Sequence, residues 1–248
     1  MPPKGTDVFI SFLRPVKYEF VFYFVIIAAL LGTGRFFALD GGLWTWFAVL
    51  VSALVFADAG RHWSGLHALD IPARNWIKGA LGTSLLWSVL MATIATIAAV
   101  LMQRNSPYYT IYDWFLNTSG PVEHIDTNGA AYVLDDGATP ATSVLWTLLI
   151  TFAVFLVFII VGLAIGVSIR HWPRLITIAA SVIVGIIVLG AFAYYLAYLA
   201  QVRAVEDEWF IPITLDSWQR LGIVLASGAV PMLVGWWAIR RSLQSPWD

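Results

Sequence analysis

Two long apolar runs constrain the fold of this chain more than any other feature. Neither residues 144–169 nor residues 175–202 contain a charged side chain, and about 20 apolar residues suffice for a helix to cross a bilayer. Charged residues make up 12% of the chain, about half of the roughly 25% that is usual in soluble domains. The sequence therefore predicts an integral membrane protein and excludes a soluble enzyme or a disordered chain. The net charge of −1 gives no signal for binding nucleic acid.

We expect six membrane-spanning helices in a single domain of residues 1–248. The expected ranges are 18–38, 42–57, 79–102, 144–169, 175–202 and 218–239, of which the second is the shortest. The alternation of apolar and polar residues that marks a membrane β-barrel does not occur. The predicted fold class is an all-α polytopic membrane protein.

The basic residues predict the orientation of these spans. Lys and Arg near span ends accumulate on the cytoplasmic side of a membrane. On this map ten of the 14 basic residues share one side, and most acidic residues lie on the other. Both termini are therefore expected in the cytoplasm. The ten basic residues are Lys4, Arg14, Lys17, Arg61, Arg74, Lys78, Arg170, Arg174, Arg240 and Arg241.

The loop of residues 103–143, between spans three and four, faces outward on this map. The turn-forming pairs Asn128-Gly129 and Asp136-Gly137 flank an apolar stretch, a pattern typical of a small β-hairpin. Five aromatic residues in the same loop strengthen the expectation that it is folded: Tyr108, Tyr109, Tyr112, Trp114 and Phe115.

The cytoplasmic loop of residues 58–78 is too charged to span a membrane and too apolar for a free linker. Its residues Trp63, Leu66 and Leu69 could form one face of a short amphipathic helix that ends near Pro72. Arg74 then follows on the helix that enters span three. Such an apolar ridge with a basic rim suits the docking of a cytosolic partner. The alternative is an interfacial loop without a partner. The stretch of residues 6–17 could likewise lie at the interface as an amphipathic segment, or be a plain polar leader.

No motif for catalysis, a metal or a cofactor is present. The chain lacks the G-x-x-x-x-G-K-[ST] sequence of an ATP-binding P-loop. Its four histidines all fall in predicted loops, where they are unsuited to bind a membrane haem. The chain is therefore not expected to be an enzyme, and no catalytic, metal-binding or cofactor-binding residue is assigned.

Small residues predict close helix contacts inside the membrane. Gly162 and Gly166 form a G-x-x-x-G pair in span four, a pattern that permits close approach of a second helix and could pack a dimer. Such residues are also common in membrane helices without this role. Trp87 falls within span three and is expected to pack against another helix.

The combination of six spans, cytoplasmic termini and a basic amphipathic loop after span two resembles the ABC-2-type permease subunit of ATP-binding-cassette exporters. The closest local likeness is LDIPARNWIKG, residues 69–79. In that family a coupling helix often ends in an apolar-Pro-x-x-Arg stretch, followed by Lys or Gly at the start of span three. Here Ile71-Pro72-Ala73-Arg74 and Lys78-Gly79 occupy those positions. The resemblance in topology covers the whole chain, whereas the resemblance in motif covers only about eleven residues.

The resemblance implies a mechanism and a set of partners. Two permease copies, or this chain and a related permease, would form the pathway in the plasma membrane of a bacterial cell. Two separate P-loop ATPase subunits would each receive a coupling segment, with contacts at Trp63, Leu66, Leu69 and Arg74. The cargo would be amphiphilic: a peptide, a lipid or a drug. Family members often have their larger external element between spans five and six, whereas the longer loop here follows span three. The alternative function is a non-transporting subunit or sensor of a larger membrane complex.

Overall fold

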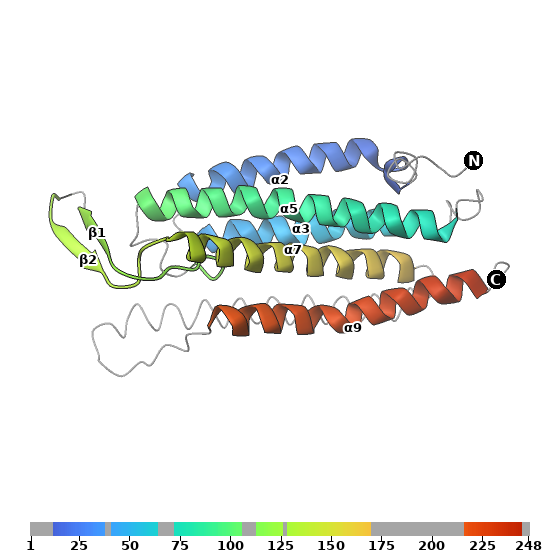
Figure 1. The fold of residues 1–248 in the computed structure, drawn as a ribbon. Helices are drawn as coiled ribbons and strands as arrows, with labels where there is room; N and C mark the ends of the chain where they lie inside the picture. The colour runs from blue at the N-terminus through green and yellow to red at the C-terminus, as the bar shows by residue number, and fades with distance from the viewer. Residues whose placement is uncertain are drawn as a thin grey trace.

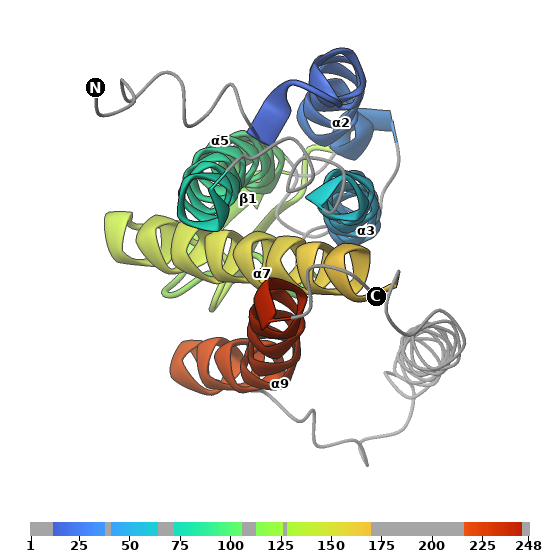
Figure 2. The ribbon, with the colours of Figure 1, turned by 90° about the vertical axis from the view of Figure 1, so that its right-hand side faces the viewer.

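The computed structural model describes residues 12–37, 41–63, 72–105, 113–125, 128–169 and 216–244. These residues form five long helices and a two-stranded sheet (Figure 1). Figure 2 shows α7 lying between α9 on one side and the group of α2, α3 and α5 on the other. The helices are α2 (Lys17–Phe37), α3 (Gly41–Arg61), α5 (Ala73–Asn105), α7 (Ala141–Ser168) and α9 (Ser217–Gln244).

Four of these helices, α2, α3, α5 and α7, are long and apolar enough to cross a membrane. They coincide with the first four predicted spans, so the prediction of a helical membrane protein is confirmed in this coarse form. The sixth predicted span lies within α9, which is not among these four helices. The fifth, residues 175–202, lies outside the described residues.

The second predicted span, residues 42–57, is shorter than the observed helix, which continues past the charged residue Asp58. Helix α3 has 21 residues and continues to Arg61, which gives a length of about 32 Å at 1.5 Å per residue. That length is sufficient to cross a hydrocarbon core of about 30 Å. Asp58 and Arg61 belong to this helix rather than to the loop, and both side chains are more than half exposed.

The third helix also exceeds its prediction, at both ends. Helix α5 has 33 residues, about 50 Å, and therefore extends past the hydrocarbon core. It begins directly after Pro72, whose carbonyl oxygen accepts hydrogen bonds from the backbone N–H groups of Asn75 and Trp76. Arg74 and Lys78 lie exposed on its first turns, as their spacing of four residues predicts for one helix face.

Helices α3 and α7 pack through a seam of very small residues. A Cβ added at Gly162 would collide with the carbonyl oxygen of Ala53, and one added at Gly166 with that of Ala57. A Cβ at Gly60 would meet the carbonyl oxygen of Leu163 at 2.8 Å. The two backbones therefore approach as closely as glycine permits, as in other small-residue membrane interfaces.

The bundle has two different ends. The hairpin end carries β1 (Val122–Ile125) and β2 (Ala131–Leu134), while α2 and α5 begin at the opposite end (Figure 1). We call the latter the Trp76 end, after a buried residue of the first turn of α5. Basic residues of the described part lie at both ends but are more numerous at the Trp76 end: Arg14, Lys17, Arg61, Arg74, Lys78, Arg240 and Arg241, against Arg35, Arg104 and Arg220 at the hairpin end.

The outer loop is folded and contains the predicted hairpin. Strand β1 pairs with β2 in antiparallel register, from Val122 opposite Leu134 to Ile125 opposite Ala131. Gly129 lies between the strands with φ 81°, a left-handed conformation that glycine adopts without steric cost. The prediction of a hairpin in this loop is confirmed, and it adds a small sheet outside the helices of a mostly helical fold.

Candidate functional site

An aromatic cluster closes the Trp76 end of the bundle. Trp63, just after α3, lies against Trp76 of α5 with ring centroids 4.9 Å apart. Phe12, which precedes α2, is 5.7 Å from Trp76 and 6.3 Å from Phe56 of α3. These rings are almost completely buried: Trp63 and Trp76 are each 2% exposed. The cluster therefore joins three parts of the chain that are distant in sequence.

Trp63 and Trp76 bracket the predicted coupling segment. The described chain stops at Trp63 and resumes at Pro72, and the contact between the two indole rings joins these flanking positions. Leu66 and Leu69 lie outside the described residues. The contact therefore joins the two described parts of the chain on either side of residues 64–71.

Exposed basic side chains surround this aromatic cluster. Arg14, Lys17, Arg74 and Lys78 are exposed. Arg61 forms an ion pair with Asp58 at 3.7 Å, which contributes little because both side chains are in contact with solvent. A set of exposed basic side chains beside the buried aromatic cluster suits either anionic lipid headgroups or an acidic protein surface.

The predicted site residues differ in their exposure and in their contacts within the chain. Arg74 is exposed, and its electrostatic contact with a partner stays a prediction. Trp63 is buried against Trp76 within the chain itself, so it is not available to enter a groove of a partner. Gly162 and Gly166 contact α3 of the same chain, so the face expected to pack a dimer is already occupied.

Two residues of this site were not singled out from the sequence. Trp76 lies four residues after Pro72, and a proline at a helix start followed by a tryptophan one turn later indicates a ring folded back over that end. Phe12 belongs to the amphipathic N-terminal stretch, and its ring is 1% exposed. This residue is therefore inserted under the helix ends instead of lying flat at the interface.

The hairpin end has a polar network centred on Asn117. Its backbone N–H donates to Thr147 Oγ1 at 2.9 Å, and its Oδ1 accepts a 2.6 Å hydrogen bond from Ser217 Oγ. The hydroxyls of Ser119 and Ser143 are 2.8 Å apart. Through these bonds the outer loop joins the first turns of both α7 and α9.

Further contacts fasten the same loop to the helices. The Arg220 guanidinium donates to the carbonyl oxygen of Trp114 at 3.0 Å. Trp46 of α3 lies 5.0 Å from Phe115, measured between ring centroids. The outer loop is thus held by α3, α7 and α9 together.

No group of three or more His, Asp or Glu residues able to hold a metal ion occurs in the part of the chain that the structure describes. His62 follows α3 and lies 3.9 Å from the Asp58 carboxylate, while His124 lies in β1 and packs on Tyr132. Each of these two histidines thus has a local structural contact.

Comparison of the chain with protein-family models, with curated proteins and with solved structures finds no match. The fold therefore defines the class on its own: a mostly helical chain with four helices suited to cross a membrane and a small folded module at one end.

Proposed function

We propose that this chain is the permease subunit of an ATP-binding-cassette exporter of the ABC-2 type. In this proposal six helices span the membrane and both termini lie in the cytoplasm at the Trp76 end. The observation that carries it is the contact between Trp63 and Trp76 at 4.9 Å. This contact joins the two positions of the chain that flank residues 64–71, beside several exposed basic residues. A coupling segment requires such an anchor, since a loose loop would absorb any displacement that a partner imposes.

The aromatic cluster would transmit that displacement to several helices. Trp76 lies in the first turn of α5 and Trp63 just after α3, while Phe12 precedes α2 and contacts Phe20 in the first turn of that helix. Because protein interiors are close-packed, a push on one ring moves its neighbours rather than compressing them. A movement of residues 64–71 would therefore tilt α2, α3 and α5 together.

The proposed roles of the loop residues follow from burial. Trp63 is an internal anchor. Leu66 and Leu69 remain the candidates to enter a groove on a partner P-loop ATPase, with Arg74 as an exposed electrostatic contact. The chain has no P-loop of its own, so hydrolysis would occur in that separate subunit. A second permease copy or a related permease would complete a pathway for an amphiphilic peptide, lipid or drug.

A second candidate function is a non-transporting subunit or sensor whose outer loop is the working part. The specific support for it is the Asn117 network, which ties that loop to α7 and α9 through Thr147 and Ser217. A ligand that altered the loop would thereby act directly on two helices.

Detergent co-purification distinguishes these two functions. The tagged full-length chain is isolated at native expression, and the retained proteins are identified by mass spectrometry. A permease subunit is expected to retain a P-loop ATPase in stoichiometric amount and to support ATP hydrolysis in the complex. Retention of other membrane proteins without any ATPase would favour the sensor and reject the permease.

A further inference from the structure

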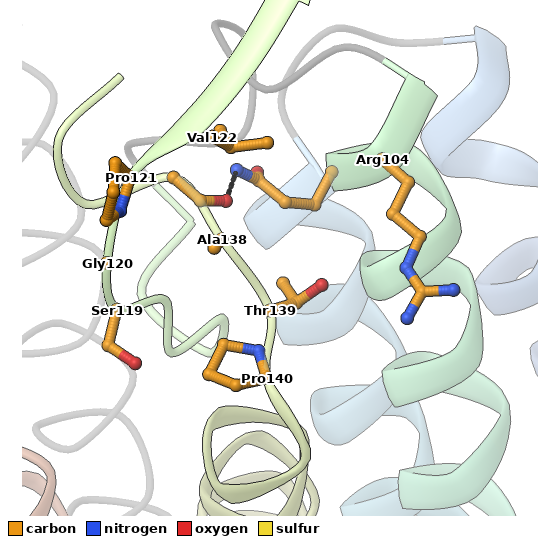
Figure 3. A pocket seen from close by; sticks show the side chains of 10 residues that line it. Arg104, Ser119, Gly120, Pro121, Val122, Ala138, Thr139 and Pro140 are labelled. Carbon is orange, nitrogen blue, oxygen red and sulfur yellow. Dashed lines mark hydrogen bonds between the residues drawn. The ribbon is translucent and has the colours of Figure 1, made fainter. Parts of the chain in front are cut away.

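A hollow of about 500 Å³ opens at the hairpin end, between the last turn of α5 and two segments of the outer loop, residues 119–122 and 137–140 (Figure 3). Its size falls within the range of sites for small ligands, which is about 300–1,000 Å³. Apolar side chains form much of the lining, including Pro121, Val122 and Pro140, and the polar groups come mainly from Gln103 and Arg104. Figure 3 shows Arg104 on one side of the hollow and Ser119 and Pro121 on the other.

Gln103 brings an unused hydrogen-bond acceptor to this hollow. Its Nε2 donates to the carbonyl oxygen of Gly137 at 2.7 Å, the bond drawn as a dashed line in Figure 3. Gln103 is only 2% exposed, and its buried Oε1 has no hydrogen-bond partner among the described residues. A buried amide oxygen without a partner costs free energy. A ligand with an O–H or N–H donor would remove that cost.

Arg104 brings a positive charge at the depth of the lipid headgroups. It follows Ile97 and Leu101 by seven and three residues, so the three lie on one face of α5. Ile97 and Leu101 are 55% and 50% exposed, which in a membrane span means contact with acyl chains. Arg104 is exposed one residue before α5 ends. A guanidinium at this position meets phosphate groups rather than hydrocarbon.

We propose that this hollow binds the headgroup of an anionic, hydroxylated phospholipid of the phosphatidylglycerol class. The phosphate pairs with Arg104, and a headgroup hydroxyl donates to Gln103 Oε1. The apolar lining covers the carbon atoms of the headgroup, while the acyl chains extend along Leu101 and Ile97. The site depends only on the described residues and is independent of the permease proposal.

Native mass spectrometry of the full-length protein in detergent tests the site. The probes are dioctanoyl phosphatidylglycerol and dioctanoyl phosphatidylethanol, which carry the same charge but differ in their hydroxyls. The wild type is expected to bind phosphatidylglycerol about fivefold more tightly, as one hydrogen bond provides. Gln103→Met should abolish this preference. Arg104→Gln should weaken both lipids about tenfold, because a charge-assisted contact is stronger.

Arg240→Gln is the matched control, since it removes an exposed arginine charge from α9, away from the hollow. It is expected to leave both affinities unchanged. Equal phosphatidylglycerol binding by the wild type and by Arg104→Gln would overturn the proposal. Competition by sn-glycerol 3-phosphate at the concentration of the lipid would also overturn it, by identifying a soluble organic anion as the ligand.

Discussion

The indole Nε1 of Trp87 donates a 3.0 Å hydrogen bond to Ser52 Oγ, and this bond joins α5 to α3 in the middle of the bundle. Ser52 in turn donates to the carbonyl oxygen of Ala48 at 2.7 Å. Both residues are buried, with Trp87 4% exposed. The ring of Trp87 also lies edge-on to Phe56 of α3, with centroids 5.6 Å apart, so a hydrogen bond and an aromatic contact together join these two candidate spans.

Ser52→Ala is expected to lower the free energy of unfolding by about 1–2 kcal/mol, because it leaves the Trp87 N–H buried without a partner. Thermal unfolding in a mild detergent, followed by circular dichroism, measures the change. Thr93→Ala is the control, since Thr93 is exposed and bonds only to its own helix. Its effect should be close to zero. An equal loss in both variants would show that the Trp87–Ser52 bond contributes nothing specific.

Gly162→Ala and Gly166→Ala are each expected to destabilise the bundle by more than about 2 kcal/mol. Each added methyl would collide with a backbone carbonyl of α3, at Ala53 or Ala57, and a backbone cannot move aside as a side chain can. The measurement is the midpoint of thermal unfolding in detergent.

Gly222→Ala in α9 is the matched control for the glycine seam. A Cβ at Gly222 meets none of the described residues within 4 Å, and alanine favours a helix over glycine by about 1 kcal/mol. This variant should be neutral or slightly stabilised. If all three variants behaved alike, close packing of α3 on α7 would not govern stability. If Gly162→Ala changed only the oligomeric state, the pair would act between copies of the chain instead.

The orientation of the chain can be tested by cysteine labelling, because the native sequence contains no cysteine. The excess of basic residues at the Trp76 end predicts that this end is cytoplasmic. A single cysteine at Ser106 should therefore react with a membrane-impermeant maleimide in intact cells, whereas one at Ser242 should react only after permeabilisation. The reverse pattern would show an inverted topology.

The sequence predicts the first four spans well because the mean hydropathy of some 20 consecutive residues depends only on that segment and not on its tertiary contacts. It misses their ends because charged residues such as Asp58 and Arg61 can continue a helix once it has left the hydrocarbon. It predicts that Gly162 and Gly166 permit close approach, but the identity of the neighbouring helix depends on the tertiary fold. The burial of Trp63 is a similar case, since it requires Trp76 and Phe12 to meet it from elsewhere in the chain.

The most discriminating prediction concerns the segment between Trp63 and Trp76. Leu66→Asp would introduce an unpaired charge into the groove of a partner ATPase, which is costly on binding. Loss of one buried anchor commonly costs about 2 kcal/mol or more, so retention of the ATPase should fall at least tenfold. The stability of the bundle should not change, because this residue lies outside the predicted spans.

Two further variants separate the partner contact from the internal anchor. Thr127→Asp adds the same charge in the outer loop and should retain normal ATPase binding. Trp63→Ala removes a buried ring and is expected to cost about 3–5 kcal/mol of stability, in contrast to Leu66→Asp. Pull-down at equal membrane expression, together with thermal unfolding, gives both readouts. If Leu66→Asp retained the ATPase and transport fully, this segment would not be the coupling site. Because the Trp63–Trp76 contact would persist in that variant, the aromatic cluster would then serve only to close the end of the bundle.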